Sequence, residues 1–351
     1  LPGDADRSAR DLRPGPRAAG GADDLRRLPN GALRARLRLS EGLSSLAGRD
    51  ALAEGARNLL TGCAGLAAGA RLVVAAENPA LGWHDAAAPE AVAAEAGRLG
   101  MTAEIVPVGG PETPAPALDA AAAAADAVIF FARLGDLGRF AQRSGGPLRV
   151  VSYARDAAAL SSPFGRTPHA AMRALKDAVD AALGAAGRIE ITCPLGTSLS
   201  GRAPRGAGPA DDVTTRRFPL GVPAPVPADG FAGSVVLARW LTPTGNRVYD
   251  RAVRRIPSPI SAEVAEGAVV AFSGPPDAVA AVRAHHAHVG ARFGGASERV
   301  HSWHAGIHPG CAYGAHAADD PDRWSNSAFS NPRLLHFHTC GAAAPGEVCW
   351  M

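Results

Sequence analysis

Two histidines, His336 and His338, lie two residues apart in the apolar segment LLHFHTCG near the end of the chain. Residues two apart on a β-strand point to the same face, so both imidazoles would lie together while Phe337 points the other way. Two imidazoles that are buried together are costly to desolvate unless they bind a partner. Neutral histidine is the commonest metal ligand in proteins. The spacing therefore predicts two ligands to one metal ion.

A third ligand is expected from the segment VHSWHAGIHPGC at residues 300–311. Its Gly and Pro residues indicate a turn, and we prefer His304 to His308 as the ligand, so that His308 remains a candidate catalytic residue. Three imidazoles on one triangular face of a metal leave the opposite face open for a substrate together with O2 or water. We expect two further histidines nearby to be structural or to support a ligand, namely His301 and His316.

The elements that must position these histidines divide the chain into three parts. Residues 1–38 are rich in Arg, Pro, Gly and Asp and are predicted to be a flexible tail. Residues 39–187 alternate helices and short apolar strands, which is typical of an open α/β domain with a parallel sheet. Residues 188–351 contain short strands separated by Gly and Pro, which predicts a β-rich, partly barrel-like, metal-binding domain. The parallel strands are expected at 71–77, 102–108, 126–132 and 147–154.

One helix is expected in the β-rich part, at DAVAAVRAHHAHVG, and its histidines are expected to be solvated. They are His285, His286 and His288. No GxGxxG motif follows the first strand, so a dinucleotide-binding site has little support.

Composition excludes several classes of function. A net charge of +3 over 351 residues, with the Arg residues scattered, argues against nucleic-acid binding. No run of 18 apolar residues is present, so no membrane span is expected. The five cysteines lack any CxxC spacing, which favours a reduced, cytoplasmic protein over a disulfide framework or a structural zinc site.

Several segments resemble one family of enzymes over roughly residues 45–351. ITCPLGTSLSGR at 191–202 and FPLGVPAPVPADGFAGSVVL at 218–237 are similar to segments of the aminopeptidase T-type metallopeptidases. The relatives of those peptidases, the iron-dependent 2,5-dihydroxypyridine 5,6-dioxygenases, are the most similar branch. That branch has a histidine before its Gly-x-Gly motif, where this chain has His304.

The chain departs from the peptidases at the positions that hold their two metals. Val222 stands where the resemblance implies a ligand glutamate, His304 replaces a second glutamate, and the terminal His-x-Asp pair becomes His336-x-His338. These changes indicate a site for one metal. The dioxygenases hold iron with two histidines and one aspartate, so the third histidine of this chain also departs from them and leaves the substrate open.

The resemblance implies a fold, a cofactor and further site residues. It implies Fe(II) as the cofactor, O2 and a small molecule as substrates, and a homo-oligomer that is a dimer or larger. Family members line the cleft where Thr197 and Ser198 occur, and Arg202 would follow as a clamp for an anion. Apart from the resemblance, the segment PGEVCW near the histidine pair offers Glu347, which is expected to orient a ligand histidine by accepting its second N–H.

Three functions remain open from the sequence. The preferred one is a mononuclear non-haem Fe(II) oxygenase, a dioxygenase of a small hydroxylated aromatic or N-heterocyclic compound. The second is a divergent aminopeptidase or other hydrolase with zinc or cobalt. The third is a non-catalytic metal-binding protein with the same fold.

Overall fold

The computed structural model describes residues 48–351 apart from 138, 140–144, 203–214, 245–248 and 343–345. Contacts divide the chain into two compact units, Leu1–Gly48 and Arg49–Met351, and the second contains every element named below. The predicted tail at 1–38 lies outside the described residues. None of the described helices combines the length and the apolar character that a membrane crossing requires.

Five parallel strands form the first sheet, called sheet A, in the order β2-β1-β3-β4-β7. Both of its faces are apolar, since Leu72 and Ile129 pack in one core while Val73 and Val128 pack in another. A parallel strand that is covered on both faces needs such a continuous apolar run. The strands are β1 (Arg71–Glu77), β2 (Thr102–Val108), β3 (Ala127–Phe131), β4 (Leu148–Ser152) and β7 (Arg216–Phe218).

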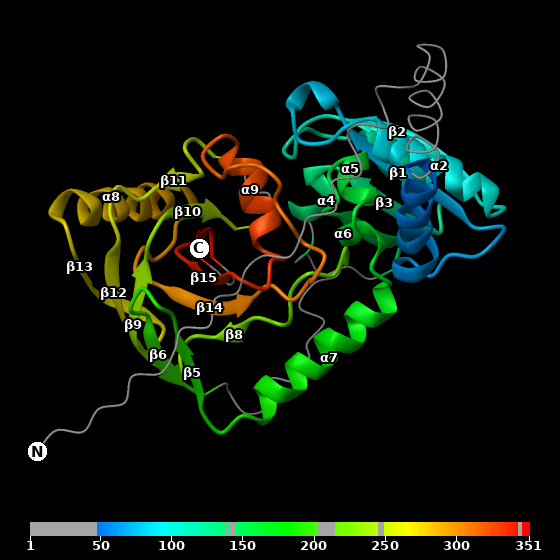
Figure 1. The fold of residues 1–351 in the computed structure, drawn as a ribbon. Helices are drawn as coiled ribbons and strands as arrows, with labels where there is room; N and C mark the ends of the chain where they lie inside the picture. Colours follow the sequence, from blue (N-terminus) through cyan, green and yellow to red (C-terminus); the bar gives the residue numbers. More distant parts are fainter. Residues whose placement is uncertain (1–47, 138, 140–144, 203–214, 245–248, 343–345) are drawn as a thin grey trace, which may run out of the picture. The chain divides into compact units, whose positions relative to one another are not determined.

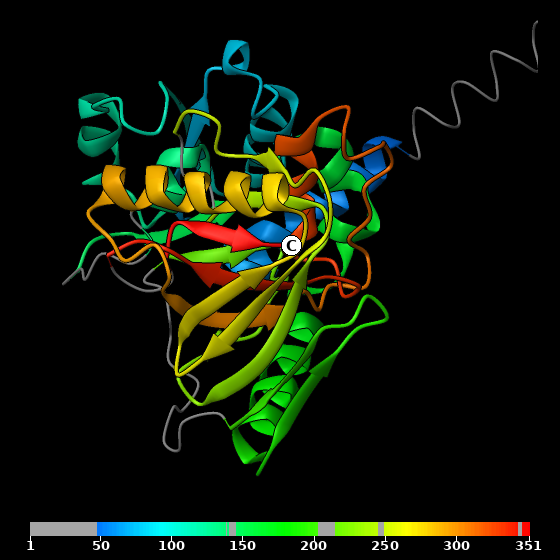
Figure 2. The ribbon, with the colours of Figure 1, turned by 90° about the vertical axis from the view of Figure 1, so that its left-hand side faces the viewer.

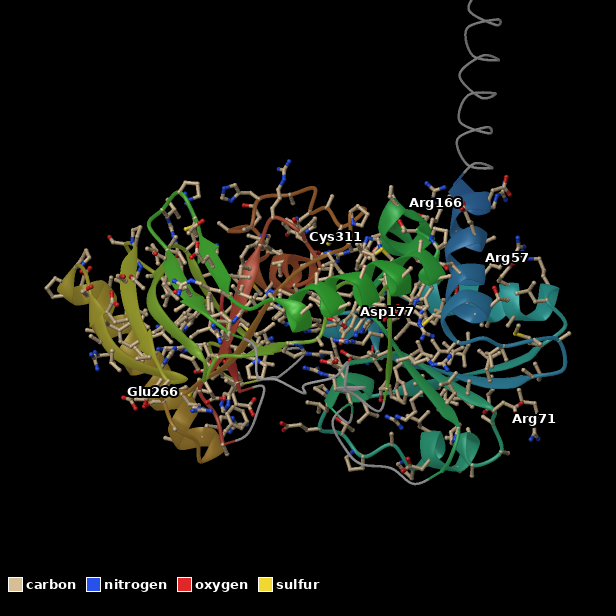
Figure 3. The ribbon with its side chains drawn as sticks, turned by 90° about the horizontal axis from the view of Figure 1, so that it is seen from below. Arg57, Arg71, Arg166, Asp177, Glu266 and Cys311 are labelled. Atoms are coloured by element: carbon tan, nitrogen blue, oxygen red, sulfur yellow. The ribbon has the colours of Figure 1, made fainter. Side chains whose placement is uncertain are left out.

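Helices cover both faces of sheet A. Three of them pack on the face of Leu72, namely η2 (Asn58–Cys63), α2 (Ala87–Arg98) and α5 (Ala157–Ser161). Leu118 of α3 (Pro116–Ala122) packs on the opposite face. Helix α7 (His169–Ala185) is exposed along most of its length, including Asp177 (Figure 3). The remaining short helices of this part are η3 (Pro79–Leu81), α4 (Arg133–Leu137) and α6 (Pro163–Arg166).

Two antiparallel sheets form the β-rich part. Sheet B has the order β13-β12-β9-β6-β5 and sheet C has the order β11-β10-β16-β15-β14-β8. Sheet B consists of β5 (Ile189–Thr192), β6 (Ser198–Gly201), β9 (Phe231–Leu237), β12 (Ile260–Ala265) and β13 (Ala268–Ser273). Sheet C consists of β8 (Val226–Pro227), β10 (Trp240–Pro243), β11 (Arg254–Arg255), β14 (Val300–Ala305), β15 (Leu335–Thr339) and β16 (Val348–Trp350).

One apolar core joins sheets B and C. The rings of Phe231 in sheet B and Trp303 in sheet C meet edge to face, with centroids 5.3 Å apart. Helix α8 (Pro276–Phe293) packs against β16 (Figure 2). There Trp350 Nε1 donates to His286 Nε2 at 3.1 Å.

The histidines of α8 correct one expectation. His285 and His286 are buried, with 6% and 2% of their surface exposed, so the prediction that they are solvated was wrong for both. His286 Nδ1 also meets the Ser297 carbonyl at 2.9 Å, which anchors α8 to the chain before β14. His288 is exposed as expected.

The predicted fold class is confirmed: an open parallel sheet is followed by a β-rich part. Strand β7 nevertheless returns to sheet A from the second part of the chain, pairing Phe218 with Ser152. The short segment RRF carries no long apolar run that would mark it as a buried parallel strand. A domain boundary at residue 187 stays a prediction.

Candidate metal centre

Strands β14 and β15 are antiparallel neighbours (Figure 1), and His304 lies directly opposite His336. Directly opposed residues point to the same face of a sheet. His304, His336 and His338 therefore share one face of sheet C, while Trp303 and Phe337 point into the apolar core. The common face predicted for His336 and His338 is confirmed. His304 lies on a strand, whereas the sequence predicted a turn.

A β-bulge at His301 decides which face His304 occupies. Val300 lies opposite Thr339 but Ser302 lies opposite His338, so His301 is an extra residue in β14. Val300 packs in the apolar core, and strict alternation from it would turn His304 into that core as well. The extra residue reverses the alternation and brings His304 to the face of the other two histidines.

The three imidazoles converge closely enough for one ion. One ring nitrogen from each lies within 4.8 Å of the others, and all three residues are buried. His304 Nε2 is 2.8 Å from His338 Nε2. Two nitrogens that are each about 2.1 Å from a metal and 90° apart lie about 3 Å from each other. The observed separation therefore suits adjacent positions around a single ion.

The surroundings of His336 favour a bound metal. It is fully buried, and neither of its ring nitrogens has a hydrogen-bond partner among the described residues. Burying a polar group without a hydrogen bond costs about 1–3 kcal/mol. A metal ion would bind the lone pair of a His336 ring nitrogen, which otherwise has no partner among the described residues. The all-imidazole donor set suits iron, zinc, copper or nickel.

Burial keeps all three rings neutral. It lowers the pKa of His336 to about 3. The pKa values of His304 and His338 are lowered well below the usual 6.5, first by burial and then by the neighbouring His336. A neutral imidazole has a lone pair available, so metal binding would not have to displace a proton near neutral pH.

Each ring has different surroundings. The Pro223 carbonyl lies beside His304, where it opposes part of the fall in pKa. Cys349 Sγ is 3.2 Å from His338 Nδ1. The ring of Phe329, which follows α9 (Pro321–Ala328), has its centroid 4.8 Å from that of His336. An apolar wall of this kind limits the access of water to a metal site.

Polar contacts join the α/β part to the helix that precedes Phe329. Tyr153, directly after β4, donates its hydroxyl proton to Asp136 Oδ1 at 2.7 Å, and Asp136 also pairs with Arg139. Asn326 of α9 donates to the Tyr153 carbonyl at 3.4 Å. This contact ties the helix that precedes Phe329 to the carboxyl edge of sheet A.

Two arginines of the α/β part place positive charge near the three histidines. The charge of Arg139 contributes to the lowered pKa of His338, and that of Arg217 in β7 contributes to the lowered pKa of His304. Sequence reasoning missed both arginines, which carry no motif. The available signal was their position, because ligands of open α/β sheets bind outside the carboxyl ends of the strands.

The other predicted site residues make contacts that do not involve the three histidines. Thr197 is buried, and its Oγ1 accepts from Val236 N at 3.0 Å, while Ser198 and Arg202 are exposed. His308 is fully buried, its Nδ1 accepts from Gly310 N at 3.1 Å, and burial lowers its pKa to about 4. Their catalytic roles stay predictions.

The atom beside the second nitrogen of His338 is the sulfur of Cys349, where the sequence predicted a carboxylate of Glu347 for one of the ligands. The backbone carbonyl of Glu347 accepts from the Tyr249 hydroxyl at 3.3 Å. The ligand-orienting role of Glu347 stays a prediction.

Side chains occupy the topological switch point of sheet A, which is the place between β1 and β3 where the strand order reverses. Glu77 at the end of β1 accepts from Arg133 Nη2 at 2.6 Å and from its backbone N at 2.8 Å. Trp83 lies under both Arg133 and Arg155, whose guanidinium carbons are 4.7 and 4.1 Å from the ring centroid. This ion pair bridges β1 and β3, where a doubly wound sheet would bind a nucleotide.

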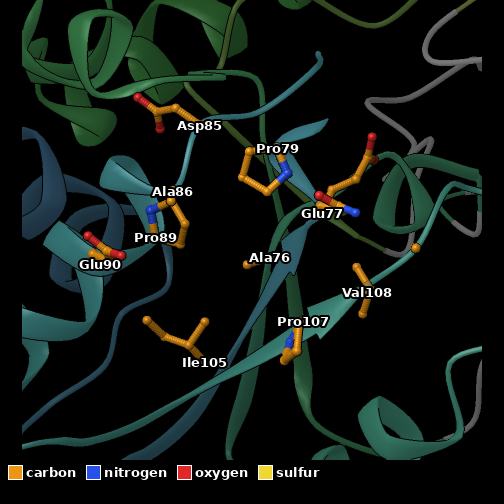
Figure 4. A pocket seen from close by; sticks show the side chains of 12 residues that line it. Ala76, Glu77, Pro79, Asp85, Ala86, Pro89, Glu90, Ile105, Pro107 and Val108 are labelled. Carbon is orange, nitrogen blue, oxygen red and sulfur yellow. The ribbon is translucent and has the colours of Figure 1, made fainter. Parts of the chain in front are cut away.

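A pocket of about 420 Å³ lies next to this ion pair, at the ends of β1 and β2 (Figure 4). Prolines line much of it, together with Ile105 and the acidic residues Glu77, Asp85 and Glu90. An acidic lining disfavours phosphate groups, in agreement with the missing GxGxxG motif.

Comparison with known proteins identifies the fold. The solved 2,5-dihydroxypyridine dioxygenase of Pseudomonas putida KT2440 has a TM-score of 0.51 and 15% sequence identity, over 85% of this chain and 89% of that chain. Wild-type AmpT of Thermus thermophilus has a TM-score of 0.48 and 14% identity, over 86% and 92%. No protein-family model and no curated protein matches the chain. The fold expected from the motif resemblance is confirmed.

Proposed function

We propose that the chain is a mononuclear non-haem iron(II) oxygenase, a dioxygenase that uses O2 on a small hydroxylated aromatic or N-heterocyclic substrate. The observation that carries the proposal is the convergence of three buried, neutral imidazoles on one face of sheet C. The likeness in fold to a 2,5-dihydroxypyridine dioxygenase supports it.

His304, His336 and His338 are the ligands in this proposal. Three imidazoles on one face leave the opposite positions for the substrate and O2. When bound, iron(II) would orient both reactants and pass electron density between them. The chain supplies the rigid strands that hold the rings, and Phe329 excludes water from the side of His336.

The positive charge around the three histidines favours anionic substrates. Three neutral ligands leave the full +2 charge of the ion uncompensated, whereas a carboxylate ligand would cancel part of it. Arg217 adds positive charge on the side of the α/β part, whereas the charge of Arg139 is compensated by its ion pair with Asp136. Anionic, chelating ring compounds such as deprotonated dihydroxypyridines or catechols fit this field best.

The remaining candidate residues would act on the substrate itself. His308 is neutral at pH 7, and because its Nδ1 accepts from Gly310 N, its one hydrogen is on Nε2. This Nε2–H has no hydrogen-bond partner among the described residues, so it is available to donate to a substrate. Thr197, Ser198 and Arg202 are proposed as substrate contacts on the resemblance alone.

Anaerobic purification followed by metal analysis tests the proposal. We expect one iron per chain and O2 uptake with a panel of dihydroxypyridines and catechols. One zinc per chain together with peptide hydrolysis would instead establish the aminopeptidase alternative. That alternative is disfavoured because no carboxylate joins the histidine cluster within the described part of the chain. Bound metal without any turnover would indicate a binding protein. A homo-oligomer is proposed by resemblance.

A further inference from the structure

The side chain of Cys349 lies next to His338 on the side away from the other two histidines. Cys349 and His338 are directly opposed residues of β16 and β15, so they share one face of sheet C. The sulfur is 3.2 Å from His338 Nδ1, while His338 Nε2 is 2.8 Å from His304 Nε2. The two nitrogens of this ring thus face two different partners.

Thr244 and the neighbouring strands restrain the sulfur of Cys349 on the side away from His338. Cys349 has no exposed surface, and Thr244 Oγ1 lies 3.4 Å from its sulfur. Thr244 is itself held by a backbone bond from its N to the Glu347 carbonyl at 3.1 Å. Cys349 also pairs with Thr242 of β10, so strands on both sides restrain it.

The position of one proton then decides whether His338 can bind a metal. A neutral imidazole carries a hydrogen on only one nitrogen. If the hydrogen is on Nε2, it points at His304 and blocks the lone pair that a metal needs. If it is on Nδ1, it needs an acceptor, and the sulfur of Cys349 is the atom in that place. The thiol can in turn donate its S–H to Thr244 Oγ1, which directs a sulfur lone pair towards His338.

We infer that Cys349 is a positioning residue that accepts the Nδ1 hydrogen of His338 and so presents Nε2 to the metal, with Thr244 orienting the thiol. This inference rests on the proposed metal site. Ligand histidines in proteins usually donate their second N–H to a carboxylate or a carbonyl, and loss of such a partner lowers metal affinity by about 10- to 100-fold. Here a thiol takes that place.

Metal affinity of the full-length protein tests the inference. Co(II) is titrated against a competing chelator and followed by its visible absorption. We expect Cys349→Ala to bind Co(II) about 10- to 100-fold more weakly and with an altered spectrum. Cys349→Ser, which keeps an acceptor of similar size, should bind within about threefold of the parent chain. Cys340→Ala is the matched control, because Cys340 is equally buried and its thiol donates to the His286 carbonyl instead.

A second measurement does not depend on a substitution. In the parent chain labelled with ¹⁵N-histidine and loaded with Zn(II), the His338 resonances should show the hydrogen on Nδ1. A hydrogen on Nε2 would overturn the inference, as would equal affinity and identical spectra for Cys349→Ala and the parent. If the parent chain binds neither Co(II) nor Zn(II), the metal site itself fails, which is a separate outcome.

Discussion

His304 lies directly opposite His336 across the β14–β15 pair, although 31 residues separate them in the chain. Their ring centroids are 4.2 Å apart. The bulge at His301 is what gives both rings the same face. Because both side chains stand on paired strands and not on a loop, a metal bound between them would be held by the rigid part of the fold.

Replacing His336 by Leu should separate metal binding from stability. Metal binding should be lost, because one of three ligands is gone. The metal-free variant should be as stable as the metal-free parent or more stable by about 1–2 kcal/mol, because a buried ring with unpaired nitrogens is removed. Urea unfolding of both metal-free proteins and metal analysis check this. The exposed His316, replaced by Leu, is the control, and one tightly bound metal per chain in His336→Leu would contradict the assignment.

Replacing Arg217 by Gln should weaken the use of anionic substrates. We expect kcat/KM to fall about tenfold for an anionic ring substrate, which corresponds to about 1.4 kcal/mol. A methyl ether of the same substrate should be much less affected, and the metal content should not change.

Arg202→Gln provides the comparison, because Arg202 is the anion clamp that the sequence predicted. It is exposed, whereas Arg217 is the residue whose charge reaches His304. A selective loss in Arg202→Gln with none in Arg217→Gln would reverse this ranking of the two arginines.

The metal-free protein should lose stability as the pH falls below about 6.5. Burial lowers the pKa of His84 to about 3 and that of His286 to about 4. Between those values and the unfolded value near 6.5, the unfolded chain binds protons that the folded chain excludes. Each such histidine therefore lowers the free energy of unfolding by about 1.4 kcal/mol per pH unit in that range, and contributes nothing above it.

Urea unfolding at several pH values between 7.5 and 5 measures this slope. His84→Leu should reduce the slope by about one proton between pH 6 and 5, while leaving its value above pH 7 unchanged. An identical slope in the variant and the parent would show that His84 titrates in the folded protein as it does in the unfolded chain.

Removing one partner of the Glu77–Arg133 pair should strongly destabilise the protein. Glu77 has no exposed side-chain surface and Arg133 only 8%, so Arg133→Ala leaves a buried carboxylate that keeps the hydrogen bond from the backbone N of residue 133 but loses its counter-charge. We expect a loss of about 3–5 kcal/mol in the free energy of unfolding. Arg188→Ala, which breaks the exposed pair with Glu190, should cost less than about 1 kcal/mol. Equal losses of unfolding free energy in the two variants would show that the buried pair contributes no more to stability than the exposed pair.

Local patterns were sufficient to predict most elements of the fold. Leu72, Val74 and Ile129 belong to short apolar runs, and runs of this length are typical of a strand covered on both faces. The shared face of His336 and His338 follows from the two-residue repeat of any strand. These features depend on residues close together in sequence, so the sequence by itself determined them.

The composition of the site was decided by the tertiary structure. The bulge that turns His304 towards His336 is a single extra residue, which alternation in the sequence does not reveal. Cys349 faces His338 because β16 pairs with β15, and Arg217 approaches His304 because β7 returns to sheet A. The bulge, the β15–β16 pair and the β4–β7 pair are all formed by backbone hydrogen bonds, in which every residue type except proline can both donate and accept. Side-chain type therefore predicts that a strand exists, whereas only the folded chain determines its register and its neighbours.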